Sequence, residues 1–144
     1  MGSVQILAGL HPAFSGIATA ILREAQALLD SDAEITGDLV RAVVGIRSLG
    51  DQAKAVAAGL SSVMVGWHQY GLALDYGIFD ANGQKYVTDG TDPRYRLVGE
   101  IAKRHGCVYG GDWHKPDWDH IEYHTGFTLS QYLAWLAANP GVRA

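Results

Sequence analysis

Residues 66–75 of this 144-residue chain read Gly-Trp-His-Gln-Tyr-Gly-Leu-Ala-Leu-Asp, and they place two potential metal ligands seven positions apart. Because side chains alternate along a strand, His68 and Asp75 would point to opposite faces if the segment were one straight strand. Gly71 lies between them and can adopt the backbone conformations of a tight turn. The stretch therefore predicts His68 on a loop, a turn at Gly71, and Asp75 inside a strand that begins near Leu72.

One imidazole and one carboxylate hold a divalent ion weakly, so a third donor is expected elsewhere in the chain. Residues 117–120, Asp-Trp-Asp-His, are the best source. Zinc bound by His68, Asp75 and His120 would have three protein ligands and a fourth position for water, which is the pattern of catalytic zinc sites. Asp117, three residues before His120, would then lie beside the metal and transfer the proton of the water to a leaving amine.

Arg47, at the end of an expected strand, is the candidate for stabilising the oxyanion that develops when an amide is attacked. A surface ion pair is the alternative role for this side chain. Zinc suits mixed imidazole and carboxylate donors, although other divalent ions can substitute for it.

Composition bounds the class of protein. A chain of 144 residues with 48% hydrophobic and 18% charged residues is expected to fold as one globular domain without a separate wall-binding domain. The net charge of −4 argues against a nucleic-acid partner. A single cysteine, Cys107, excludes an intramolecular disulfide and a cysteine-based zinc finger. Residues 1–22 carry no charged side chain but also no basic n-region, so synthesis in the cytoplasm and no membrane association are expected.

Hydrophobic spacing predicts an α+β domain, a small and mostly antiparallel sheet packed with helices. Helices are expected at 12–29, 51–60, 93–105 and 129–138, and strands at 39–46, 72–79, 84–87, 107–109 and 120–123. In the strand 72–79, the side chains expected on one face are Leu72, Leu74, Tyr76 and Ile78. The buried side chains expected in the first and last helices are Phe14, Ile17, Ile21, Leu28, Leu129, Tyr132, Leu133 and Leu136.

Three motifs occur in order along the chain. They are Gly45-Ile-Arg47-Ser48 with Gln52 (G-x-R-S-x-x-x-Q), His68-x-x-Gly71-x-Ala73-x-Asp75 (H-x-x-G-x-A-x-D), and Asp117-x-x-His120 followed by Ile121-Glu122 (D/E-x-x-H). Together they resemble the zinc D-alanyl-D-alanine peptidase family, and most closely its phage endolysin and bacterial L-alanyl-D-glutamate peptidases. The resemblance extends over about residues 10–123 and implies the small α+β fold shared by hedgehog domains and D-Ala-D-Ala peptidases.

The resemblance implies a role for each motif residue. His68, Asp75 and His120 would bind zinc, Asp117 would be the catalytic acid and base, and Arg47 would contact the substrate or the transition state. Residues expected to contact the substrate, the peptide stem of peptidoglycan, are Gln52, Ser48 and Trp67. One position departs from the family, because Gly66 stands where a substrate-binding serine is common.

Other residues compete for these roles. His114 and His124 are rival metal ligands, and His124 could instead support His120 from the same strand face. Asp119 is expected to point away from His120, its neighbour on a strand. Trp67, Trp113 and Trp118 are explained equally well by packing and by a substrate groove. The acidic loop 80–92 lacks the ligand spacing of an EF-hand, so a turn is expected there.

The function expected from these motifs is hydrolysis of a stem-peptide amide, with L-Ala–D-Glu as the favoured bond. The alternatives are a D,D-carboxypeptidase or dipeptidase acting on D-Ala-D-Ala ends, and a non-catalytic zinc-containing module that binds the wall or a protein partner. The protein is expected to be a monomeric phage or prophage product that acts on the cell wall after release.

Overall fold

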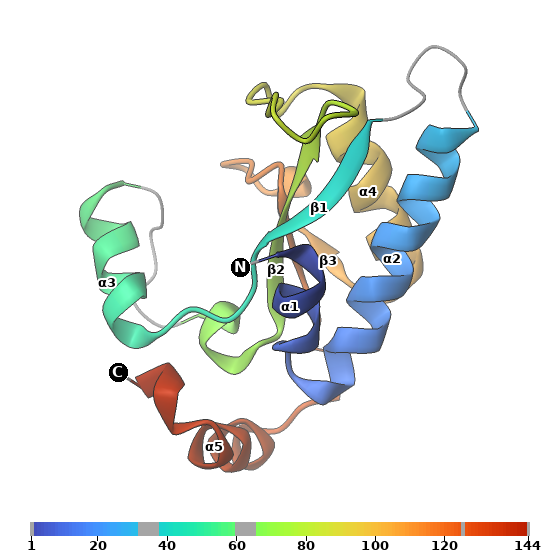
Figure 1. The fold of residues 1–144 in the computed structure, drawn as a ribbon. Coiled ribbons are helices and arrows are strands. Elements are labelled where there is room, and N and C mark those ends of the chain that lie inside the picture. Colours follow the sequence, from blue (N-terminus) through green and yellow to red (C-terminus); the bar gives the residue numbers. More distant parts are fainter. Residues whose placement is uncertain (1, 32–37, 60–65, 125, 144) are drawn as a thin grey trace.

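An antiparallel sheet lies at the centre of the molecule. The computed structural model describes residues 2–31, 38–59, 66–124 and 126–143. Within these residues, four strands pair in the spatial order β1 (Leu39–Val44), β2 (Ala73–Phe79), β4 (His120–Glu122) and β3 (Val108–Tyr109) (Figure 1). The α+β class and the antiparallel sheet predicted from the sequence are confirmed.

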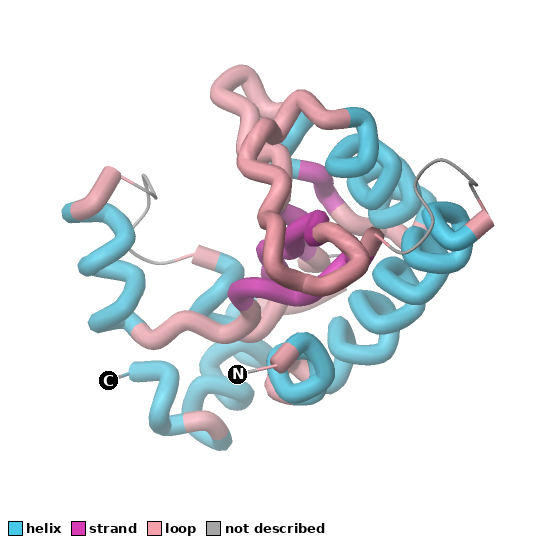
Figure 2. The backbone as a smooth tube through the Cα atoms, turned by 45° about the horizontal axis from the view of Figure 1, so that its top comes forward, coloured by secondary structure: helices cyan, strands magenta, loops and turns pink. Residues whose placement is uncertain are grey.

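Helices surround this sheet (Figure 2). The α-helices are α1 (Ser3–Ala8), α2 (Pro12–Asp30), α3 (Leu49–Ala57), α4 (Pro93–Arg104) and α5 (Leu129–Ala138). Short 3₁₀ helices are η1 (Trp67–Tyr70), η2 (Gly110–Asp112) and η3 (Pro140–Arg143). Helices α2 and α4 pack side by side along the sheet, whereas α3 and α5 lie at the opposite end of the molecule (Figure 1).

The strand β2 divides the molecule into a core side and a site side. Leu72, Leu74, Tyr76 and Ile78 are fully buried and belong to the hydrophobic core, as their spacing predicted. Because side chains alternate along a strand, Asp75 stands on the other face. One strand thus supplies both the centre of the core and a polar site residue.

The predicted buried faces of two helices are partly wrong. In α2, Leu28 is 45% exposed, because the buried stripe runs through Phe14, Ala18, Ile21, Leu22, Ala25 and Leu29. In α5, Tyr132 and Trp135 are buried, whereas Leu129 and Leu133 are largely exposed. In each helix the angular position of a side chain, rather than its hydrophobicity, decides whether it faces the neighbouring elements and is buried.

Other element boundaries also differ from the prediction. The return strand expected at 84–87 is reduced to a single bridge between Tyr86 and Phe79. Strand β1 ends at Val44, after a register shift, and the next four residues form a loop. Helix α3 begins at Leu49 because the Ser48 hydroxyl caps it, accepting from the Asp51 N–H at 3.0 Å; residue 60, its expected end, lies outside the described residues.

The outer edge of β1 is paired with side chains. The Gln26 amide from α2 accepts from the Val40 N–H at 2.9 Å and donates to the Asp38 carbonyl at 2.7 Å. The Ser3 hydroxyl of α1 accepts from the Ala42 N–H at 2.9 Å. These bonds satisfy backbone groups that an edge strand would otherwise present to another chain. Helix α1, which the sequence did not predict as a separate element, therefore helps to satisfy the edge of β1.

The corrected face of α5 gives a stability prediction. Trp135→Ala should lower the free energy of unfolding by roughly 3–5 kcal/mol because it removes a large buried side chain. Leu133→Ala should change it by no more than about 0.5 kcal/mol because that side chain faces solvent. Urea unfolding followed by circular dichroism measures both values. Equal losses in the two variants would contradict the observed face.

Candidate metal centre

The turn predicted between the first two candidate ligands is present. His68 lies in η1, and Gly71 follows it with a positive φ of 70°. The Gly71 N–H donates to the His68 carbonyl and the Leu72 N–H to the Trp67 carbonyl, at 3.2 and 3.0 Å. These bonds close the turn, after which β2 begins. The left-handed backbone at this position favours glycine, which explains Gly71 in the motif.

Strand pairing brings the third candidate ligand to the same place. The register sets His120 of β4 directly opposite Asp75 of β2, and Glu122 opposite Ala73. Directly opposed side chains share one face of a sheet. His120 and Glu122 therefore stand on the site side with Asp75, while Ile121 joins the core.

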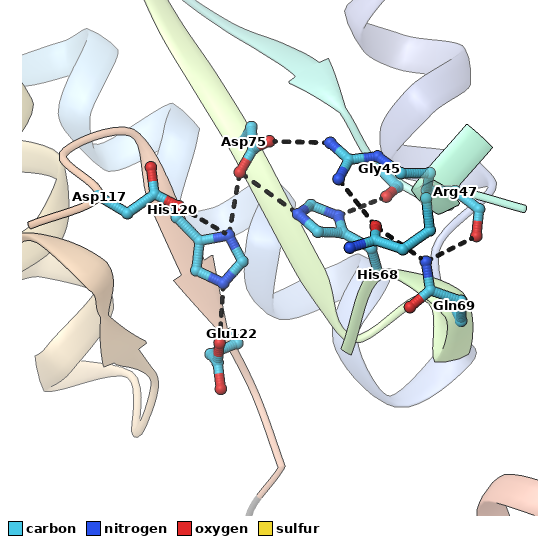
Figure 3. A network of polar contacts seen from close by, with 9 residues as sticks. Gly45, Arg47, His68, Gln69, Asp75, Asp117, His120 and Glu122 are labelled. Atoms are coloured by element: carbon cyan, nitrogen blue, oxygen red, sulfur yellow. Dashed lines mark hydrogen bonds and ion pairs between the residues drawn. The ribbon is translucent and has the colours of Figure 1, made fainter. Parts of the chain in front are cut away.

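Three donor atoms converge on one point (Figure 3). Asp75 Oδ1 lies 3.4 Å from Nε2 of His68 and 3.0 Å from Nδ1 of His120. Both histidines are buried and only about a tenth of each side chain is exposed. The sequence prediction that a loop histidine, a strand carboxylate and a distant histidine would meet agrees with this geometry.

The remaining ring nitrogen of each histidine is held by an oxygen. Nδ1 of His68 lies 2.8 Å from the Gly45 carbonyl, and Nε2 of His120 lies 2.8 Å from Oε1 of Glu122. Each outer nitrogen therefore donates its proton outward, which leaves the inner nitrogen able to present a lone pair. Two such lone pairs facing one carboxylate oxygen require a proton or a cation between them. The donor set thus fits a divalent metal with mixed imidazole and carboxylate ligands.

Asp75 and His120 shift each other's pKa. Burial opposes ionisation of Asp75, but hydrogen bonds from His120 and His68 outweigh it and hold the pKa of this carboxyl well below its usual range. Burial likewise opposes a charge on His120, yet the bonds with Asp75 and Glu122 raise its pKa to about 10. Without a metal, His120 is therefore an imidazolium at neutral pH.

Asp117 stands beside the three donors. Its Oδ2 lies 3.9 Å from Nδ1 of His120, and about half of its side chain is exposed. Its neighbour Asp119 does not point away as expected, because it lies in the turn before β4 rather than within the strand. Carboxylate oxygens of Asp75, Asp117 and Asp119 lie within 4.8 Å of one another. Burial, the charge of Asp75 and the adjoining Asp117 raise the pKa of Asp119 to about 8.

Arg47 approaches the cluster from the opposite side. Its Nη2 lies 3.6 Å from Oδ2 of Asp75, and its Nη1 donates to Oε1 of Gln52 at 2.9 Å. Gln69 also donates to that Gln52 oxygen and to the Arg47 carbonyl, at 3.2 Å each. The Arg47 side chain is 17% exposed, so it is an element of the site rather than half of a surface ion pair.

The comparisons with known proteins agree with this geometry. Residues 61–123 match the model of a D-alanyl-D-alanine carboxypeptidase family, a range that contains all three candidate metal ligands and Asp117. The resemblance to the zinc D-alanyl-D-alanine peptidase family is confirmed. The fold of this chain is similar to that of the L-Ala D-Glu endopeptidase ChiX of Serratia marcescens. The two chains are 22% identical, and the match has a TM-score of 0.62 over 85% of this chain and 86% of that chain. No curated protein sequence matches the chain.

The predicted substrate contacts and the rival metal ligands do not belong to the group of three donors. Gln52 is 2% exposed, which favours holding Arg47 over contacting a substrate. Ser48 caps α3. Trp67 is half-buried, and its ring stacks on His124 at 4.2 Å between centroids. His124 contacts Oε2 of Glu122 at 3.3 Å rather than joining the three donors, and His114 is exposed and outside the potential metal-binding groups found among the described residues.

Glu122, Gln69 and the Gly45 carbonyl also bond with residues of the site, although the sequence alone predicted no role for them. Glu122 follows His120 by two residues, and that spacing on a strand is the signal that places both on one face.

The loop 80–92 contains a turn as expected, because Oδ1 of Asp80 accepts from the N–H groups of Gln84 and Lys85.

The bond between Glu122 and His120 predicts an effect on metal binding. Glu122→Gln should weaken zinc affinity roughly 10–100-fold, because the amide stabilises the donor tautomer of His120 less than a carboxylate does. Competition with a chromophoric chelator gives the dissociation constant. Glu100→Gln, which changes an exposed surface ion pair, should leave the affinity unchanged. An unaltered affinity in Glu122→Gln would contradict the assigned role.

The raised pKa of His120 predicts pH dependence. Zinc must displace the proton of the imidazolium, so below a pKa of about 10 the two compete for one nitrogen. Zinc affinity should therefore rise about tenfold per pH unit between about pH 7 and 9, on the exchange of one proton. The same competition assay at pH 7, 8 and 9 measures the slope. A dissociation constant that stays flat over this range would contradict the proton assignment.

Proposed function

We propose that this protein is a zinc-dependent peptidase that hydrolyses an amide bond of the peptidoglycan stem peptide, with L-Ala–D-Glu as the favoured bond. The observation that carries the proposal is the convergence of two imidazole nitrogens and one carboxylate oxygen, with Asp117 and Arg47 on either side. The family match supports a peptidase, and the name of the structural neighbour supports the choice of bond.

The residues divide the chemistry between them. Zinc held by His68, Asp75 and His120 would polarise the scissile carbonyl and lower the pKa of a bound water. Asp117 accepts the proton of the attacking water and returns it to the leaving amine, which suits a carboxylate beside the ligands and open to solvent. The Arg47 guanidinium, next to Asp75, offsets the negative charge that develops on the carbonyl oxygen.

Substrate contacts are proposed for the exposed aromatic residues around this centre. Trp113 is 39% exposed, and its ring centroid lies 5.2 Å from that of His120. A large apolar ring that is open to solvent beside a metal ligand is placed to pack against a substrate. Trp67 precedes His68 directly and remains a second candidate, while Gln52 and Ser48 act by holding Arg47 and α3.

The cellular setting is also a proposal. A phage or prophage lysin made in the cytoplasm and acting on the wall after release, as a monomer, agrees with a peptidoglycan substrate. Among the described residues, no helix has the length and apolar character needed to cross a membrane.

A D,D-carboxypeptidase that removes terminal D-Ala is the second candidate, because the matched family model carries that description. The two candidates use the same metal centre and differ in the part of the stem peptide that lies against Arg47 and Trp113. The products of digestion separate them.

Digestion of purified peptidoglycan tests the proposal. The protein should release fragments with a new N-terminal D-Glu, detected by mass spectrometry, and a chelator should abolish the release. Asp117→Asn should lower kcat roughly 10²–10⁴-fold, because the amide cannot accept the proton. Asp112→Asn, in an exposed ion pair with Arg96 and Lys103, is the matched control and should keep wild-type activity.

Each outcome of the digestion supports a different conclusion. Loss of terminal D-Ala alone would favour the D,D-carboxypeptidase. Full activity in Asp117→Asn would remove Asp117 from its role. Zinc binding without release of any fragment would favour the non-catalytic module.

A further inference from the structure

The segment that carries Asp117 is a turn outside the regular sheet. Residues 117–119 precede β4, and the Asp117 side chain is about half exposed. A general base has to be held within about 0.5 Å of its working position to act efficiently. Something other than burial of its own side chain must therefore fix Asp117.

Backbone bonds clamp the turn on both sides. The Asp117 N–H donates to the Gly110 carbonyl at 2.9 Å, and the Tyr76 N–H donates to the Asp119 carbonyl at 2.9 Å. Between them, the Trp118 carbonyl receives two tyrosine hydroxyls: Tyr109 donates at 2.8 Å and Tyr76 at 3.1 Å. The middle peptide of the turn is thus held by side chains that come from the core.

The two hydroxyls are not equivalent. Tyr76 has a single hydroxyl proton, and its nearer acceptor is the Tyr95 carbonyl at 2.7 Å. The Tyr109 hydroxyl donates to the Trp118 carbonyl. Tyr109 is therefore the main anchor of the turn.

The Tyr109 ring is itself fixed. It is 1% exposed and lies against Gly99 of α4 and Gly111 of η2. A Cβ added at either glycine would come within 2.4 Å of ring atoms, so both positions need glycine for the ring to fit. The Arg96 guanidinium lies over the ring, 5.4 Å from its centroid. An immobile ring gives its hydroxyl a fixed position from which to hold the turn.

We propose that Tyr109 is a positioning residue for catalysis, which holds Asp117 in place through the Trp118 carbonyl, with Tyr76 as a weaker second anchor. The proposal rests on the proposed function of Asp117 as acid and base. In the described part of the chain, the hydroxyls of both tyrosines bond to backbone carbonyls and not to the three metal donors, so the effect is on the proton-transfer step and not on metal binding. A merely structural hydroxyl would contribute to stability alone.

Tyr109→Phe tests the proposal, because it removes the hydroxyl and keeps the ring. On the substrate of the wild-type protein, kcat should fall about tenfold, the fold-change of losing one hydrogen bond of about 1.4 kcal/mol, while KM and zinc affinity stay within twofold. Tyr95→Phe is the matched control: Tyr95 is also buried, and its hydroxyl donates to the Val87 carbonyl, away from the turn. Its kcat should stay within twofold of the wild type. Tyr76→Phe should lower kcat less than Tyr109→Phe.

A second readout does not need activity. The Asp117 N–H should exchange with deuterium at least about tenfold faster in Tyr109→Phe than in Tyr95→Phe, because the turn opens more easily. An unchanged exchange rate, or equal losses of kcat in the two variants, would overturn the positioning role. If the wild type cleaves nothing, the proposed function fails, and the exchange rates alone then decide whether Tyr109 anchors the turn.

Discussion

The pairing of Asp75 with His120 across β2 and β4 is the constraint on which the rest of the site depends. A shift of one residue in this register would turn His120 and Glu122 toward the core and Ile121 toward the site. The hydrophobic effect resists that shift, because Leu74, Ile121 and Tyr109 are each 0–1% exposed on the opposite face. The packing of the core therefore sets the geometry of the polar cluster, although no core residue takes part in its chemistry.

The same alternation explains how one strand can contact both the candidate metal centre and the turn that carries Asp117. Asp75 and Tyr76 are neighbours in β2 but stand on opposite faces. The side chain of the first meets the two histidines. The second bonds with Asp119 through its backbone N–H and with Trp118 through its hydroxyl, on the core side of the sheet. A displacement of β2 would thus move Asp75 together with the groups of Tyr76 that hold the turn, because the two residues are neighbours in one strand.

Sequence reasoning succeeded where local rules act alone. The turn at Gly71 and the alternation of Leu72 to Ile78 follow from backbone preference and period, and both are present. It failed where tertiary neighbours decide. Trp135 rather than Leu133 is buried because α5 packs near η1, and Asp119 faces the site because its turn breaks the strand alternation. The sequence also does not reveal that the Gln52 side chain is buried and accepts a hydrogen bond from Arg47.

The residues of this site form a buried group and an exposed group. His68, Asp75, His120 and Glu122 are buried or nearly so, and each makes several fixed contacts, which suits side chains that must hold a constant geometry. Asp117 and Trp113 are exposed, which agrees with the proposed roles of the first as acid and base and of the second as a substrate contact. Exposed side chains are not fixed by packing as buried ones are, so the backbone that carries them has to be rigid. Under the proposed positioning role, the bonds to the Trp118 carbonyl supply that rigidity for Asp117 from two buried tyrosines.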